Sequence, residues 1–141
     1  MMPATTPGAL APAVIELLEA DRSLASFGIH VSSANDGHAV LTAEVAERFA
    51  NGHGIAHGGL IFALADTALA VAATSLILGT VTSESSIMYL APAAVGDLLH
   101  AEATVRSAVG RHTVIDVTIR TQDRVVAEFR GRGISRRGGQ S

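Results

Sequence analysis

The sequence predicts an α+β protein in which an antiparallel sheet of five or six strands wraps around one long hydrophobic helix. Leu60 to Leu78 contains no Gly or Pro and is rich in Ala and Leu, which favours a helix. Apolar residues surround its whole circumference, which predicts burial on all sides. Several later segments alternate apolar and polar residues, as strands with one buried face do. A curved sheet can supply the cover that such a helix needs.

The elements expected before this helix are short. Ala9 to Ala20 predicts a helix because Val14, Leu17 and Leu18 share one face. The further expectations are an extended piece over Ile29 to Ser32, a turn at Asn35-Asp36-Gly37, a strand over His38 to Val45 and a helical turn over Ala46 to Ala50.

The segments after the helix predict the rest of the sheet. Polar residues such as Glu84, Glu102 and Asp116 alternate with apolar ones, so we expect them on a solvated sheet face. The predicted strands are Val81 to Leu90, Leu98 to Val109, His112 to Thr121 and Arg124 to Ile134.

Composition narrows the class of protein. The length of 141 residues predicts one domain over 1–141. We expect flexible tails at 1–8 and 135–141. The hydrophobic content of 48% favours self-association. A net charge of −3 gives no basic surface for nucleic acid, and the absence of cysteine excludes thiolate chemistry. The apolar helix contains Asp66 and lacks flanking cations, which argues against a membrane span. Without a basic signal peptide, a cytoplasmic protein is expected.

A candidate catalytic site lies where the helix begins. Asn51 to Gly59 reads NGHGIAHGG, and its last glycines leave the first backbone N–H groups of the helix bare, ready for an oxyanion or a carbonyl. Inside the helix, the ionised carboxylate of Asp66 costs several kcal/mol unless a partner compensates it. His57 and Asp66 are nine residues apart and look like two halves of one site.

Each of these residues also has a structural interpretation. His53 and His57 have the spacing of a helical metal pair, but the glycines around them argue against a helix there, and no metal site is expected. The alternatives are a hydrogen-bonded core acid for Asp66, close packing for Gly58 and Gly59, a helix cap for His57 and a turn residue for Asn51.

The region from Phe27 to Ile134 resembles the acyl-CoA thioesterases of the hotdog fold. It is most similar to the PaaI-like, phenylacetic acid degradation subgroup of the 4-hydroxybenzoyl-CoA thioesterase type. The likeness is carried by Asn51 to Gly59 with Asp66, and by Tyr89-Leu90-Ala91-Pro92, Gly96-Asp97 and Phe129-Arg130-Gly131.

The resemblance implies hydrolysis of an acyl-CoA thioester, such as an aryl-acetyl-CoA, without metal or bound cofactor. Asp66 would be the general base or nucleophile, and the Gly58 N–H would form the oxyanion hole. Asn51 and His57 would position the thioester and the loop. The other expected substrate-binding residues are Gly59, Phe62, and Thr82 or Ser83. Many relatives have a basic residue where this chain has Ala91. The expected contact to the CoA phosphates is therefore Arg111, Arg130 or Arg132.

The resemblance also implies a homodimer, often part of a homotetramer, in which each site combines Asp66 of one chain with Asn51 and Gly58 of another. Two other functions stay open at this point. One is a hotdog hydratase or dehydratase that uses His57 as an acid or base. The other is a non-catalytic acyl-CoA-binding protein.

Overall fold

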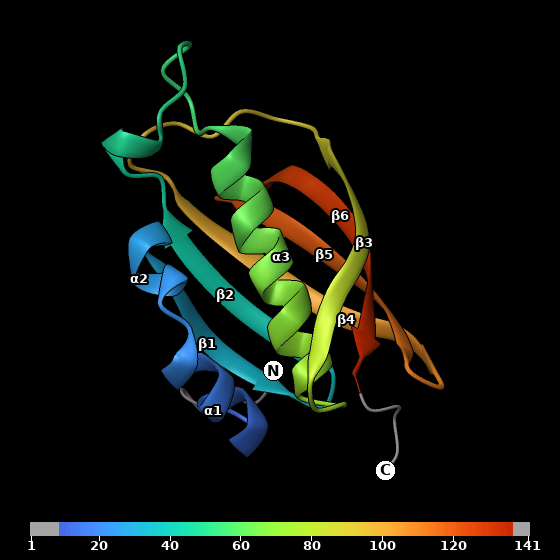
Figure 1. Ribbon diagram of the computed structural model, residues 1–141. Coiled ribbons are helices and arrows are strands. Elements are labelled where there is room, and N and C mark those ends of the chain that lie inside the picture. The colour runs from blue at the N-terminus through green and yellow to red at the C-terminus, as the bar shows by residue number, and fades with distance from the viewer. Residues whose placement is uncertain (1–8, 137–141) are drawn as a thin grey trace.

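The computed structural model describes residues 9–136, in which six strands form one antiparallel sheet in the order β1-β2-β4-β5-β6-β3. Helix α3 lies across the inner face of this sheet (Figure 1). The elements are α1 (Pro12–Ala20), α2 (Ser23–Phe27), β1 (Ile29–Asn35), β2 (His38–Glu44), a 3-10 turn (Glu47–Phe49), α3 (Gly58–Thr74), β3 (Thr80–Tyr89), β4 (Leu98–Val109), β5 (His112–Thr121) and β6 (Arg124–Ser135).

Most predicted elements are confirmed. β4 and β5 have the predicted bounds, and Gly110 turns between them with a φ of 60°. The predicted turn before β2 has positive φ at Asp36 and Gly37, the conformation of a tight two-residue hairpin. The short helix α2 was not predicted from the sequence. Just before it, the Asp21 carboxylate accepts from the Ser23 N–H at 2.8 Å.

Several boundaries differ from the predictions: the first helix begins at Pro12 and not at Ala9, and β1 continues to Asn35 beyond the predicted Ser32. Two further differences, at the end of α3 and of β6, have a clear physical cause. The long helix was expected over Leu60–Leu78 but ends at Thr74. Ser75 stops it because its hydroxyl donates to the Ala72 carbonyl at 2.7 Å and accepts from the Gly37 N–H at 2.8 Å. Ser135 was expected in a flexible tail, which is wrong: it is buried at the end of β6, where it pairs with β3. The expected tail over 1–8, and residues 137–141 of the tail expected over 135–141, lie outside the described residues.

The core lies between α3 and the inner face of the sheet. Leu64 and Leu69 of α3 are fully buried, as are Leu99 and Ile115 of the sheet. Gly131 of β6 allows this close packing, because a Cβ there would lie 2.4 Å from a methyl group of Leu69. The arrangement is the one that the resemblance to the hotdog fold implies.

One side of α3 remains open in the single chain, so the prediction of burial on all sides is wrong for that side. Asp66 lies on it and is only partly buried. The open side borders β3, the edge strand of the sheet, through the hydrogen bond between Asp66 and Thr82. Its partly exposed residues follow each other at spacings of one and three, as residues on one side of a helix do: Phe62, Ala63, Asp66, Thr67 and Ala70.

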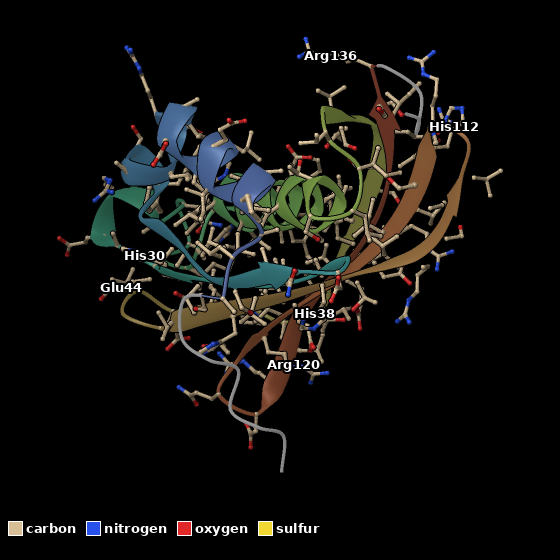
Figure 2. The ribbon with its side chains drawn as sticks, turned by 90° about the horizontal axis from the view of Figure 1, so that it is seen from below. His30, His38, Glu44, His112, Arg120 and Arg136 are labelled. Atoms are coloured by element: carbon tan, nitrogen blue, oxygen red, sulfur yellow. The ribbon has the colours of Figure 1, made fainter. Side chains whose placement is uncertain are left out.

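The outer face of the sheet is polar, as predicted. Figure 2 shows the labelled side chains of His38 and Arg120 on the face away from α3. Glu102 bonds His38 at 2.6 Å, and Asp116 accepts from Arg106 at 2.9 Å. No helix within residues 9–136 combines the length and hydrophobicity that crossing a bilayer needs.

Candidate active site

Asn51 organises the loop that leads into α3. Its side-chain oxygen accepts from the backbone N–H groups of His53 at 2.9 Å and Ile55 at 3.2 Å. Its own backbone N–H donates to the Ile55 carbonyl at 2.8 Å. The interpretation of Asn51 as a turn residue therefore holds. Its carboxamide NH2 has no acceptor among the described residues, so it can still donate to a ligand.

His57 is the N-cap of α3, as one of the two interpretations predicted. Its Nδ1 accepts from the Gly59 N–H at 2.8 Å, and its carbonyl accepts from the Leu60 N–H at 3.0 Å. The Gly58 N–H has no acceptor within residues 9–136. Of the two glycines, it is thus Gly58 that offers a free donor at the positive end of the helix.

Gly58, whose N–H is free, lines an apolar hollow of about 490 Å³. Asn51 and Gly58 line it from the loop and the helix start. Tyr89, at the end of β3, donates its hydroxyl to the Gly58 carbonyl at 3.1 Å. The remaining lining residues are aliphatic or proline: Ile55, Ala56, Ile61, Leu90, Ala91, Pro92 and Ala93. Such a hollow suits a carbonyl group joined to an apolar chain.

A second hollow, of about 430 Å³, lies on the other side of the helix start. His57 and Gly59 line it together with Leu60, Arg48 and the stacked rings of Phe27 and Phe49. Gly59 was predicted to bind substrate, but its N–H is occupied by His57. The His57–Gly59 segment therefore separates two hollows and offers its free donor to the first.

The carboxylate of Asp66 is held by β3. Thr82 donates its hydroxyl to Asp66 Oδ1 at 2.7 Å. Of the two predicted hydroxyls, Thr82 therefore contacts Asp66. The Ser83 hydroxyl accepts from Arg132 Nε at 3.1 Å instead. No described residue donates to Oδ2 of Asp66, so this oxygen is available for chemistry.

The two halves of the predicted site do not meet within one chain. Gly58 and Asp66 are eight residues apart on α3, which places them about 12 Å apart along its axis. Phe62 lies between them in sequence and packs edge-on against Phe129, with ring centroids 5.5 Å apart. The chain therefore has a donor site and an acid site on the same helix.

The predicted arginines do not line the donor hollow. Arg130 binds Asp116 on the outer face of the sheet, and Arg132 lies 3.5 Å from Glu84. Arg111 donates to the Ser135 carbonyl at 2.7 Å, at the end of the sheet where α3 terminates. Arg124, which the sequence analysis did not single out, contacts a lining residue: it donates to the Pro92 carbonyl at 3.0 Å.

No three His, Asp or Glu side chains gather at metal-binding distances in the described part of the chain. What the arrangement offers chemically is a free N–H donor in an apolar hollow and a carboxylate oriented by a hydroxyl. These two parts suit attack on a carbonyl compound.

Residues 53–128 match the family model described as Thioesterase superfamily. The chain belongs to this superfamily and has its hotdog fold. It is 40% identical over 117 residues to the acyl-coenzyme A thioesterase PaaI of Escherichia coli, covering 82% of this chain and 84% of that protein. The resemblance stated from the sequence is thus confirmed.

Solved structures show the same likeness. The PaaI protein of the E. coli phenylacetic acid degradation operon superposes with a TM-score of 0.84 at 36% identity, covering 90% of this chain and 96% of that one. A hypothetical thioesterase protein from Streptococcus pneumoniae, solved with coenzyme A, has a TM-score of 0.70 at 31% identity, and the match covers 75% of this chain and 86% of that one.

Proposed function

We propose that this protein is an acyl-CoA thioesterase that hydrolyses an acyl-CoA, with aryl-acetyl-CoA as one candidate, to the free acid and CoA. The unpaired Gly58 N–H in an apolar hollow carries the proposal. The likeness to PaaI, which is named an acyl-CoA thioesterase, supports it. The reaction needs no metal or bound cofactor, since a backbone donor and a carboxylate suffice for it.

In the proposed reaction, the thioester carbonyl oxygen accepts a hydrogen bond from the Gly58 N–H. Attack on the carbonyl carbon moves negative charge onto this oxygen, and a fixed donor at a helix N-terminus stabilises that charge without reorganising. Asp66 either takes the proton of an attacking water or attacks as the nucleophile itself. In the water route, the water oxygen forms a C–O bond, the C–S bond breaks, and the proton taken by Asp66 passes to the leaving CoA thiolate. In the nucleophile route, the C–S bond breaks as an acyl-Asp66 anhydride forms; water then hydrolyses this anhydride to the free acid, and its proton passes to the CoA thiolate.

We further propose that two chains share each site. Asp66 lies about 12 Å along α3 from Gly58 of its own chain, on the open side of the helix. In a twofold-symmetric dimer, Asp66 of each chain can lie at the Gly58 hollow of the other chain. The smallest assembly that satisfies this is a homodimer, and a homotetramer of two such dimers satisfies it equally.

The shared arrangement also bears on recognition of CoA. Arg132 is exposed on β6, next to Gly133, which pairs with Thr82, and its side chain contacts Ser83 and Glu84. Of the three predicted arginines, we propose Arg132 as the one that meets a phosphate of CoA. Arg111 is held by Ser135 at the far end of the sheet and is left out of the proposal.

The hydratase alternative requires His57 to act as an acid or base. Its Nδ1 is already committed to the Gly59 N–H, which favours the capping role. The non-catalytic alternative predicts saturable binding of acyl-CoA with no release of thiol.

A thiol-release assay over aryl-acetyl, aroyl and straight-chain acyl-CoAs tests the proposal. Wild-type protein should release CoA, and Asp66→Ala and Asp66→Asn should lower the rate by about 10²-fold or more. Asp116→Asn, which removes a carboxylate on the outer sheet face, is the matched control and should keep the wild-type rate. Binding without thiol release, or wild-type rates in both Asp66 variants, would overturn the proposal.

A further inference from the structure

Tyr89 contacts the oxyanion-donor glycine directly. It is the only tyrosine of the chain and the last residue of β3. Its hydroxyl donates to the Gly58 carbonyl at 3.1 Å, and its ring lines the same hollow as Gly58. A Cβ added at Gly58 would lie 3.1 Å from the hydroxyl oxygen and 3.2 Å from Cζ of Tyr89. The ring therefore rests against the glycine backbone.

The peptide group between Gly58 and Gly59 is held at both of its polar atoms. Tyr89 donates to its carbonyl oxygen, and His57 Nδ1 accepts from its N–H at 2.8 Å. One of these partners belongs to the loop before α3, and the other belongs to the edge strand. The two hydrogen bonds thus clamp one peptide plane from two separate elements.

Such a clamp matters because two consecutive glycines have more backbone freedom than any other pair. The orientation of the Gly58 N–H depends on the torsion angles on either side of its Cα. An oxyanion donor is effective only when its direction is fixed before the reaction. Tyr89 is itself anchored, since it pairs with Ala127 in the β3–β6 ladder.

We propose that Tyr89 is a positioning residue for the reaction: through the Gly58 carbonyl it fixes the peptide that orients the free Gly58 N–H toward the thioester. This inference rests on the proposed function for its kinetic consequence. The clamp itself is a structural property and can be measured independently of turnover.

Tyr89→Phe removes the hydroxyl and keeps the ring that lines the hollow. We expect kcat to fall about 3- to 10-fold while KM stays within about twofold, because the lost hydrogen bond acts on the transition state more than on binding. Met88→Leu, on the adjacent exposed residue of β3, is the control and should keep both constants. Circular dichroism and the melting temperature check that each variant is folded.

Amide hydrogen exchange at Gly59 provides the second readout. In Tyr89→Phe, the Gly59 N–H should exchange about 3- to 10-fold faster than in the wild type, because one of the two restraints on its peptide is gone. In Met88→Leu, the exchange rate should not change.

The outcomes separate the two proposals. Wild-type kcat together with wild-type Gly59 exchange in folded Tyr89→Phe would remove the positioning role. If the wild-type protein hydrolyses no thioester of the panel, the proposed function fails, and the exchange measurement alone decides whether Tyr89 clamps the peptide. A rise in KM with unchanged kcat would also overturn the inference, since Tyr89 would then contribute to binding only.

Discussion

The hydroxyl of Thr82 on β3 donates a 2.7 Å hydrogen bond to Oδ1 of Asp66 in the middle of α3. This bond joins the edge strand to the helix on the open side of the molecule. It fixes one oxygen of the carboxylate and leaves the other without a donor among the described residues. Thr82 therefore has the position of a residue that orients the acid.

Thr82→Val preserves the shape of the side chain and deletes the donor. We expect kcat to fall about 10-fold or more, because a hydrogen bond to a charged group is worth more than one between neutral groups. Thr82→Ser should keep most of the activity. Ser83→Ala, which removes the neighbouring hydroxyl, is the matched control. An unchanged kcat in folded Thr82→Val would show that the carboxylate needs no orientation from β3.

A series at Gly58 separates the loss of the N–H from crowding. Gly58→Ala keeps the N–H but brings a methyl group to about 3.1 Å from Tyr89, so a mild loss of turnover is expected. Gly58→Pro adds a similar bulk and deletes the N–H. The backbone tolerates proline here, since the first helical turn accepts it and His57 already has the extended φ of −62° and ψ of 137°.

Gly58→Pro should therefore be at least about 10²-fold slower than wild type and clearly slower than Gly58→Ala. Thiol release under saturating substrate measures this ratio, with circular dichroism as the folding check. Equal rates for the folded alanine and proline variants would assign Gly58 a packing role only.

The cap at His57 is expected to contribute to stability. His57→Ala leaves the Gly59 N–H without its acceptor and should lower the free energy of unfolding by about 1 kcal/mol, whereas His57→Asn can restore a cap. His53→Ala, an exposed histidine of the same loop, is the control. Urea denaturation measures the difference. If His57→Ala were as stable as His53→Ala, the hydrogen bond would contribute nothing measurable.

How far the sequence predicts this molecule depends on the element. β4 and β5 could be predicted to the residue because strict alternation and a glycine turn are local features. The end of α3 could not, because it depends on the hydrogen bond between Ser75 and Gly37, which are distant in sequence. The apolar run simply continues past Thr74, so local pattern extends the helix too far.

The candidate site shows the same limit. Asn51, Gly58 and Asp66 could be selected because the motif and the helix start are local. The choice between Thr82 and Ser83 could not be made from the sequence. In a regular strand, Ser83 would share the inner face with the half-buried Ile87, and Thr82 would point outward. The register shift between Thr82 and Glu84 in the β3–β6 pair reverses this and turns Thr82 toward the helix. Tyr89 was missed as a contact of Gly58 because only the fold brings the end of β3 to the helix start.

The ion pairs of the outer sheet face predict a pH dependence of stability. Hydrogen bonds from Arg130, with a further one from Arg106, hold the pKa of Asp116 below its ordinary value. A carboxylate with a lowered pKa in the folded state stabilises the fold fully above its unfolded pKa of about 3.9. The contribution is lost as the pH falls through the lower folded value.

Asp116→Asn should therefore be less stable than the wild type near about pH 7, and the difference should shrink as the pH falls below about 4. Urea denaturation over this range measures it, with Asp123→Asn as an exposed control. A difference that is absent at neutral pH, or that stays constant down to about pH 3, would contradict this account.

The central claim is that Asp66 of one chain works with Gly58 of another. Asp66→Asn and Gly58→Val each disable one half of the site, so each homodimer should be nearly inactive. After subunit exchange in equal amounts, half of the dimers are mixed, and one of the two sites in each mixed dimer is intact.

Thiol release by the exchanged mixture is the most direct measurement of the claim. It should recover to about one quarter of the wild-type rate if each site is shared across a twofold axis. No recovery, with mixed dimers demonstrated by affinity tags, would place Asp66 and Gly58 in the same chain's site and contradict the account.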